Sequence, residues 1–440
     1  MSAKIRYAQV GLGARSITFS TAVLKDYADS SEMVGYCDTS QTRMEYYNNH
    51  YAKTLGTKPV PTFRPDQFEQ MIKQQKVDCV IVTSIDRTHH HYITRAMELG
   101  CNAITEKPMT IDADKCQLIL DTIKKTGKKL TVTFNYRYAP RNTKVKELLA
   151  SGVIGEVKSI HFEWLLDTTH GADYFRRWHR DKKNSGGLMV HKSTHHFDLV
   201  NWWTGTTPKT VFALGDLVYY GRINAEKRNE IRAYDRCHGA KAAEGDPFAI
   251  YLEKDEAMRE MYLNAEKDDG YVRDRSVFAD GISIEDDMAV LVKYRNGQTM
   301  SYHLTAYSPW EGLRVNFNGT KGRLEYEVVE NSYVSGSARD INRPEIRTAA
   351  NYIGPEPTTI LVRPLFQQPY KVELGDIKEG GHGGGDSRLM HDVFAPVKRD
   401  DPLGHRADHI AGTMSILTGI AANKSFQTGL PVNVEDLVRF

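Results

Sequence analysis

The sequence predicts a parallel α/β domain of the doubly wound Rossmann type, followed by an α+β domain built on an open, mainly antiparallel sheet. In the first part of the chain, short apolar runs alternate with helical patterns, and this alternation builds a parallel sheet with helices on both faces. After residue 150 the apolar runs alternate with polar residues, which is typical of strands with one solvated face. A chain of 440 residues usually forms more than one domain. We therefore expect domains at 1–130 and 131–440.

The amino-terminal elements follow from the apolar periodicity. Strand-like runs are predicted at 5–10, 32–37, 77–82, 102–105 and 130–134. Helical patterns lie between them, at 17–29, 41–55, 66–74, 92–99 and 113–126.

The carboxyl-terminal region has a different pattern. A helix is predicted at 141–151, and strands at 157–166, 289–294, 299–306, 314–318 and 322–328. The polar stretch 221–287 is interpreted as an insertion that decorates the sheet, with helix formers at 252–265. An irregular arm is expected at 330–380, and a last helix at 409–424.

Composition excludes several functional classes. The chain has 58 basic and 56 acidic side chains and a formal charge of +2, which gives no attraction to nucleic acid or to an anionic membrane. Its five cysteines lack metal-ligand spacing, as in a protein kept reduced. No apolar run reaches the roughly twenty residues that a membrane span needs. These features, with no signal-peptide pattern at the start, predict a cytoplasmic protein.

A glycine-rich turn follows the first predicted strand and opens a helix. Its residues are Gly11-Leu12-Gly13-Ala14-Arg15-Ser16. Gly11 allows a tight turn, Gly13 allows the backbone to approach a pyrophosphate, and the small Ser16 permits close helix–strand packing. An ordinary strand–helix turn is the alternative. We interpret the turn as a dinucleotide cradle because the next predicted strand ends in an acidic residue.

That acidic residue is Asp38, at the end of the second predicted strand. It lies where a carboxylate accepts hydrogen bonds from the adenosine ribose. Since a carboxylate there repels a 2′-phosphate, NAD is the expected cofactor. Arg15 and Arg43 keep NADP as the alternative.

The segment Thr105-Glu106-Lys107-Pro108 follows another predicted strand. The carboxyl ends of parallel strands face the ligand crevice, and Pro108 fixes the local backbone. Lys107 can therefore reach a substrate hydroxyl, stabilise the developing alkoxide or relay a proton. An ordinary surface lysine is the alternative.

A histidine-rich segment follows two glycines, Gly186-Gly187. His191 and His195 are four residues apart, so on one helix they would share a face. They could bind substrate and transfer a proton, ligate a metal, or be hydrogen-bonded core residues. Cys237 and His238 could join a metal site only weakly, since no second cysteine is near, and we expect no metal.

Two further polar clusters are candidates for substrate binding. Trp178 could stack on a sugar while Arg176 or Arg177 binds its hydroxyls; a solvated loop or a subunit contact is the alternative. The glycine run 380–386 is interpreted as a flexible loop that carries His382 and Asp386 into the substrate cleft.

Together these motifs resemble the Gfo/Idh/MocA family, the relatives of glucose–fructose oxidoreductase and inositol dehydrogenase. The resemblance extends from the amino terminus to about residue 205, with a weaker match near the carboxyl terminus. The matching segments are Gly11-Leu12-Gly13, Asp38, Thr105-Glu106-Lys107-Pro108, Asn135-Tyr136-Arg137-Tyr138, the stretch 152–157 and the stretch 186–198.

The resemblance implies a nicotinamide cofactor and a catalytic pair formed by Lys107 and His195. The family often has aspartate at the position of His191, so either His195 alone is the base or His191 shares the work. Asp86 stands where asparagine is common. The resemblance further implies that a set of residues lies beside the cofactor: Ser84, Asp86, His89, Glu106, Asn135, Tyr136 and Arg137.

The leading hypothesis is an NAD-dependent oxidoreductase acting on a hydroxyl or keto group of a sugar, a sugar derivative or a cyclic polyol. A glycosidase that retains NAD and works by transient oxidation, elimination and re-reduction is the second candidate. A non-catalytic cofactor-binding sensor is the third, but it would need no proton-transfer pair. The expected partners are a small-molecule substrate and further copies of the chain, in a homodimer or homotetramer.

Overall fold

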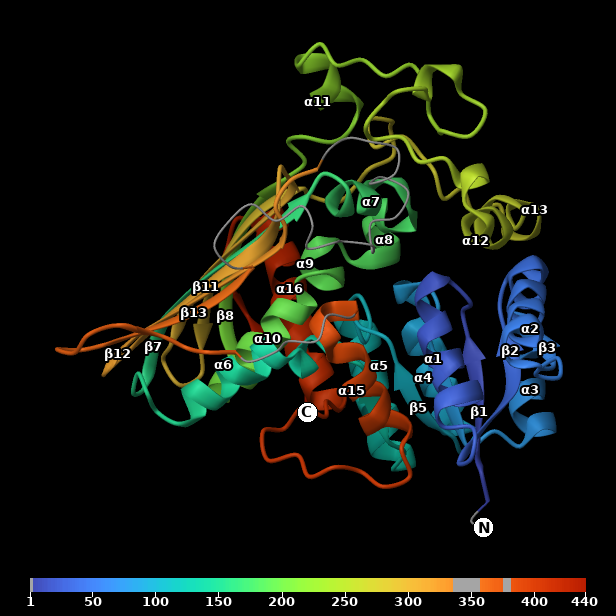
Figure 1. Ribbon diagram of the computed structural model, residues 1–440, viewed down its shortest axis with the longest axis horizontal. Helices are drawn as coiled ribbons and strands as arrows, with labels where there is room; N and C mark the ends of the chain where they lie inside the picture. The colour runs from blue at the N-terminus through green and yellow to red at the C-terminus, as the bar shows by residue number, and fades with distance from the viewer. Residues whose placement is uncertain (1–2, 335–356, 375–380) are drawn as a thin grey trace.

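A computed structural model describes residues 3–334, 357–374 and 381–440, without the side chains of 381–383. Two sheets organise the chain, one in each half (Figure 1). The predicted fold class is confirmed. The predicted boundary near residue 130 stays a prediction.

The first sheet has six parallel strands in the order β3-β2-β1-β4-β5-β6. This order reverses between β1 and β4, and ligands of such sheets bind outside the strand ends at that reversal. The strands are β1 (Ile5–Val10), β2 (Ser31–Cys37), β3 (Thr62–Phe63), β4 (Cys79–Val82), β5 (Asn102–Thr105) and β6 (Leu130–Val132). The helices are α1 (Ile17–Thr21), α2 (Gln41–Leu55), α3 (Phe68–Gln75), α4 (His89–Glu98) and α5 (Ala113–Thr126).

The second sheet has nine strands in the order β14-β13-β12-β11-β7-β10-β9-β8-β15. Only β7 and β10 pair in parallel, so the sheet is mainly antiparallel, as predicted. Its strands are β7 (Val157–Asp167), β8 (Pro208–Asp216), β9 (Asp287–Tyr294), β10 (Thr299–Ser308), β11 (Glu311–Gly319), β12 (Gly322–Asn331), β13 (Thr358–Pro364), β14 (Tyr370–Lys371) and β15 (Val432–Asn433).

Helices of the second half lie between its sheet and the first domain (Figure 1). They are α6 (Pro140–Ala150), α7 (His170–Arg176), α8 (Lys182–Ser185), α9 (Leu188–His191), α10 (Thr194–Thr204), α15 (Gly381–Phe394) and α16 (His409–Thr428).

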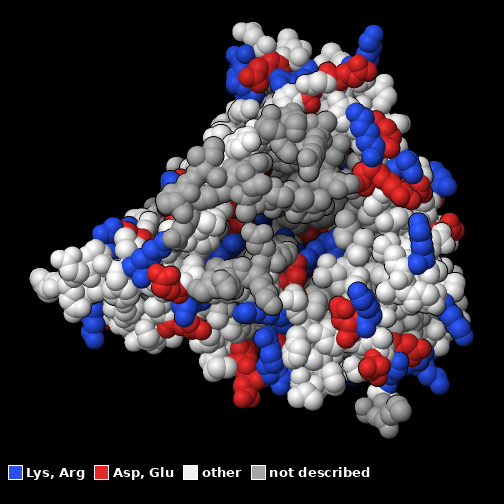
Figure 2. Space-filling view, viewed as in Figure 1, with Lys and Arg blue, Asp and Glu red and all other residues white. Residues whose placement is uncertain are grey.

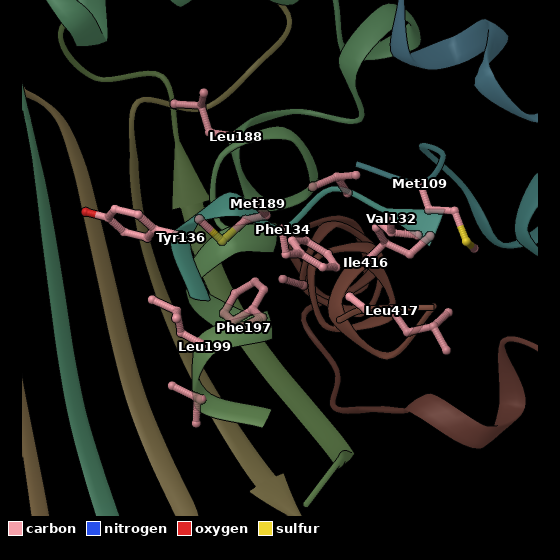
Figure 3. Packing of buried hydrophobic residues seen from close by; sticks show 14 of the residues in the cluster. Met109, Val132, Phe134, Tyr136, Leu188, Met189, Phe197, Leu199, Ile416 and Leu417 are labelled. Carbon is pink, nitrogen blue, oxygen red and sulfur yellow. The ribbon is translucent and has the colours of Figure 1, made fainter. Parts of the chain in front are cut away.

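The last helix, α16, joins the two halves. Figure 3 shows Ile416 and Leu417 packed among Val132, Phe134 and Met189, which come from both halves. A Cβ on Gly419 would lie 2.3 Å from the Met189 carbonyl oxygen, so helix and backbone touch. This packing fixes α9 and α10, which carry the histidines, against the cofactor domain.

Three secondary-structure predictions were wrong. Within the arm expected at 330–380, the described residues 357–374 contain β13 and β14, because β13 pairs with β12; 335–356 and 375–380 lie outside the described residues. The stretch 252–265 is broken into short helical turns, with only α12 (Glu256–Met258) as α-helix. The glycine run expected to be a flexible loop is the first turn of α15 from Gly381 onward. Strand β8 was not predicted at all.

Charge is mixed over the face seen in Figure 2, where basic and acidic side chains alternate without a continuous patch of either sign. None of the helices in the described ranges is both long and apolar enough to cross a bilayer.

Candidate active site

A cavity of about 680 Å³ lies where the first sheet meets the second half. Its floor is formed by residues after β1, β4 and β5, and its roof by α7, α9, α10 and the segment 262–273. Most of the predicted site residues line it: Gly11, Gly13, Ala14, Arg15, Asp38, Ser84, Asp86, His89, Glu106, Lys107, Asn135, Arg177, Trp178, His191 and His195.

The glycine turn has the shape that a dinucleotide requires. Gly11 has φ +84°, and a Cβ there would lie 2.4 Å from the Ser84 Cα, so only glycine fits at the strand-order reversal. A Cβ on Gly13 would meet only the Tyr262 hydroxyl, at 3.7 Å. Ser16 does not line the cavity; its hydroxyl donates to the Gly13 carbonyl at 2.7 Å and shapes the turn.

The carboxylate of Asp38 organises the adenosine end. It accepts the Leu12 N–H at 2.6 Å and the Arg43 Nε–H at 3.0 Å. A second carboxylate, Asp269, also pairs with Arg43. This guanidinium is therefore balanced by two acids before any ligand binds.

Arg15, the other cation that made NADP an alternative cofactor, is also paired with two carboxylates. Its Nε donates to Glu106 at 2.9 Å, and its two terminal nitrogens donate to Asp386 at 2.8 and 3.0 Å. Asn135 donates to the same Asp386 at 2.7 Å. Asp386 thus anchors α15 to the cofactor end.

The insertion packs on the core of the second half through Ala225, Val277 and Phe278, and another part of it reaches the cofactor domain. The Tyr262 hydroxyl accepts the Ala14 N–H at 3.0 Å. Asp268, in α13 (Glu266–Asp269), accepts the Thr42 N–H at 2.8 Å and the Ser40 hydroxyl at 2.6 Å. This contact with the first domain was not predicted, because the polar pattern of the segment gives no hydrophobic face that would show where it docks.

Lys107 follows β5 and is partly buried in the cavity wall. Its Nζ donates to the His191 carbonyl at 3.1 Å. Burial lowers the pKa of its ammonium group, and the nearby Glu106 and Asp86 oppose that shift. A lysine with a lowered pKa can give up and regain a proton more readily than an exposed one.

His191 and Asp86 form a buried pair. His191 Nδ1 lies 2.6 Å from Asp86 Oδ2. Burial, reinforced by Lys107 and Arg177, lowers the pKa of the imidazole well below its usual value. Burial raises the pKa of Asp86, while Lys107 opposes the rise. The ring is therefore neutral near pH 7 and can accept a proton.

His195 lies on the next helix. α9 ends at His191 and α10 begins at Thr194, so the two histidines do not share one helix as expected, although both line the cavity. The His195 ring packs against Tyr136 and Phe134, with centroids 5.7 and 6.2 Å away. Lys107 and His195 thus border the same cavity.

Besides Ser16, three predicted site residues lie outside the cavity wall. Arg137 forms a buried ion pair with Asp198 at 2.6 Å. The Tyr136 hydroxyl donates to Glu330 at 3.1 Å, and its ring packs against that of His195. Arg176 donates to the Phe248 carbonyl. The predicted substrate residue His382 has a side chain outside the described residues.

Sequence reasoning missed several lining residues: Tyr174, His179, Tyr262, Asp269, Tyr271 and Arg273. His179 directly follows the predicted substrate residue Trp178, and its ring is 4.2 Å from that of His191. The residues of the insertion carry no motif that could have identified them.

A metal site finds no support in the described part of the chain, where no group of three His, Cys, Asp or Glu side chains is arranged to hold an ion. Cys237 lies in a small separate cluster with Tyr234, Ala243 and Ala249, so it does not join His191 and His195.

Comparison with known proteins follows the same division of the chain. Residues 5–134 match the Gfo/Idh/MocA oxidoreductase family, NAD-binding Rossmann fold, and residues 146–434 match its C-terminal alpha/beta domain. The NAD-binding match agrees with the glycine turn and with Asp38, so the predicted cofactor is confirmed.

Two relatives extend over most of the chain. A Bacillus subtilis protein named as an oxidoreductase, YteT, is 34% identical over 97% of this chain and 97% of its own length. A glycosyl hydrolase family 109 protein of Akkermansia muciniphila is 22% identical over 99% of this chain and 83% of its own.

A solved structure shares the fold. The WlbA dehydrogenase of Bordetella pertussis, in complex with NADH and UDP-GlcNAcA, has a TM-score of 0.62 at 16% identity and covers 98% of both chains. The two matching regions and the similarity over nearly the whole chain show that this protein belongs to the Gfo/Idh/MocA oxidoreductase family.

Proposed function

We propose that the protein is an NAD-dependent dehydrogenase that oxidises or reduces a hydroxyl or keto group of a sugar, a sugar derivative or a cyclic polyol. The observation that carries this proposal is that Lys107, His191 and His195 border the same cavity as the glycine turn. A redox ring at the inner end of that cavity would meet groups that can transfer a proton to or from a substrate hydroxyl.

The residues divide the chemistry between them. Bound NAD would accept or deliver hydride. Lys107, held by the His191 carbonyl, stabilises the negative charge that develops on the substrate oxygen. His195 takes the hydroxyl proton, and the neutral His191, oriented by Asp86, shares that work.

NAD is preferred to NADP in this proposal. A 2′-phosphate needs a free cation, but Arg43 is already paired with Asp38 and Asp269, and Arg15 with Glu106 and Asp386. Near Arg43 the 2′-phosphate would meet three carboxylates. Two of them, Asp38 and Asp269, pair with Arg43, and the third, Asp268, accepts the Ser40 hydroxyl.

A direct test is to supply NAD with a panel of free sugars and cyclic polyols and to follow reduced nicotinamide by absorbance. The proposal expects turnover with at least one sugar or polyol. It fails if NAD binds and no member of the panel is oxidised, and if the matching keto compounds are not reduced by NADH.

A glycosidase that retains its NAD is the second candidate, and the insertion favours it. The hydrogen bonds of Tyr262 and Asp268 hold the segment 255–275 against the glycine turn and the start of α2. A segment held there would slow exchange of the cofactor. A relative named as a family 109 glycosyl hydrolase also covers 99% of this chain. Aryl glycosides given without added cofactor test this candidate: release of the aglycone supports it.

Self-association is part of the proposal. The open face of the second sheet leaves Leu214 62% and Leu291 57% exposed, and exposed apolar residues on a sheet face favour contact with another chain. Light scattering should give the mass of a dimer or a tetramer. A monomer at all concentrations would contradict it.

A further inference from the structure

The cavity wall that faces the histidines contains guanidinium groups from two distant segments. Arg177 follows α7, and Arg273 comes from the insertion; both line the cavity. Their nearest acid is Asp173, which lies in α7.

One carboxylate serves three arginines here. Asp173 lies 2.8 Å from Arg273, 3.1 Å from Arg177 and 3.7 Å from Arg176. Arg176 turns away and donates to the Phe248 carbonyl. The other two face the cavity, so among the described residues this wall carries more positive than negative charge.

Burial makes that excess costly unless a ligand offsets it. The Arg273 side chain is only 6% exposed, and among the described residues its Nε meets no hydrogen-bond acceptor. A buried cation is normally paired and fully hydrogen-bonded. This geometry indicates that an anion completes the site.

The positive charge lies close to the reacting groups. The Arg177 guanidinium is 5.8 Å from the centroid of the Tyr174 ring, and that ring is 5.5 Å from the ring of His191. Lys107 and Lys192 add positive charge at this end. The acids there are fewer than these cations: Glu106 pairs with Arg15, which leaves Asp86, hydrogen-bonded to the neutral His191, and Asp173.

We infer that the substrate carries a carboxylate, as a uronic acid or another sugar acid does, and that Arg177 and Arg273 bind it. Arginine recognises carboxylates with paired N–H donors. The ring of Tyr174 spans the distance from Arg177 to His191. A sugar ring of similar size can place its carboxylate at the arginines and a hydroxyl at Lys107. This inference rests on the proposed dehydrogenase activity and names its substrate class.

A phosphate of the cofactor is the other oxyanion source within reach. Arg273 lies 5.7 Å from the centroid of the Tyr262 ring, and the Tyr262 hydroxyl contacts the glycine turn at Ala14. The experiment must therefore separate substrate binding from cofactor binding.

The first measurement compares matched pairs of probes on the wild-type protein with NAD: D-glucuronate against D-glucose, and D-galacturonate against D-galactose. We expect kcat/KM to be about 100-fold higher for an acid than for its neutral partner, because a neutral sugar leaves the buried arginines unpaired. Equal use of acids and neutral sugars overturns the inference and leaves the dehydrogenase proposal standing.

The second measurement uses Arg177→Gln and Arg273→Gln, with Arg232→Gln as the control. Arg232 also belongs to an ion-pair cluster of the insertion, with Glu230 and Asp246, but it does not line the cavity. We expect Arg177→Gln to raise KM for the acid by about 100-fold while NAD affinity, read by quenching of protein fluorescence, stays as in the wild type. Arg177→Lys should restore part of the loss.

The outcomes decide whether the two arginines bind the substrate carboxylate or the cofactor phosphates. A loss of NAD affinity in Arg177→Gln and Arg273→Gln, with the preference for acids unchanged, would give the cations to the cofactor phosphates and overturn the inference. If Arg273→Gln fails to fold because Asp173 loses its partner, the more exposed Arg177 carries the test. If no probe is turned over, calorimetric titration of D-glucuronate and D-galacturonate into the NAD complex decides: binding that Arg177→Gln abolishes supports the inference, and absence of binding overturns it.

Discussion

The two ends of the cavity differ in their charge balance and in how they are assembled. At the adenosine end, the cation Arg43 is paired with Asp38 and Asp269. At the substrate end, the cations outnumber the acids that face them among the described residues, and His191 is neutral. A balanced end suits a cofactor whose ribose only needs hydrogen-bond acceptors, whereas an end with excess charge suits a ligand that brings its own charge.

Loss of the proposed base should have the largest effect, and only on the substrate end. His195→Ala removes a group that transfers a proton, which contributes about 10²- to 10⁴-fold in rate, so kcat should fall by that factor. NAD affinity should not change, since the His195 ring packs against Phe134 and Tyr136 and not against the glycine turn. Steady-state kinetics and fluorescence titration check both. Full activity in this variant would remove His195 from the mechanism.

A smaller loss is expected from Asp86→Asn. The carboxylate orients His191 through a 2.6 Å contact, and loss of a charged hydrogen bond corresponds to about 10- to 100-fold in kcat/KM. His191→Asn should give a similar loss, and the double variant should be no worse than either single one. Additive losses would show that the two residues act separately.

The pH profile of sugar oxidation should be broad. Since the pKa of His191 is lowered well below 6.5, its neutral, proton-accepting form persists as pH falls through 6.5, and the rate should decline only below that value. The pKa of Lys107 is lowered from 10.5, so the rate should decline at alkaline pH before 10.5 is reached, as the ammonium group is lost. A plot of log kcat/KM against pH checks both limbs. An acid limb at or above pH 6.5 that persists in His195→Ala would contradict the role of a buried neutral His191.

The smallest effect belongs to the adenosine end. Asp269→Asn removes one of the two carboxylates on Arg43 and should improve NADP affinity relative to NAD by about fivefold, the equivalent of roughly 1 kcal/mol. Glu266→Gln is the matched control, because this acid of the same helix pairs with Arg236 instead. An unchanged ratio of affinities would show that Asp38 alone sets the preference.

The same contrast explains what the sequence could and could not predict. The glycine turn, Asp38 and the segment around Lys107 are local motifs whose geometry depends on a strand end, and the structure places all of them at the cavity. Arg137, implied by the resemblance, does not line this cavity, since only the fold brings Asp198 beside it. Its neighbour Tyr136 does not line it either, and its hydroxyl is hydrogen-bonded to Glu330.

The substrate end depends on contacts between residues far apart in the chain. Arg273 meets Asp173 across 100 residues, and Tyr262 meets Ala14 across 248. The insertion has no apolar periodicity, so nothing in its sequence shows that it would close on the first domain. The Asp86–His191 pair could have been suspected, because the sequence departs from the family pattern at both positions.

The central claim is that Lys107 and His195, 88 positions apart in the sequence, act on the same nicotinamide ring. Crystals of the protein soaked with NAD test it most directly. We expect the adenosine at Asp38, the pyrophosphate at Gly13, and the nicotinamide beside both Lys107 and His195. A nicotinamide ring bound away from either of these two residues would contradict the account.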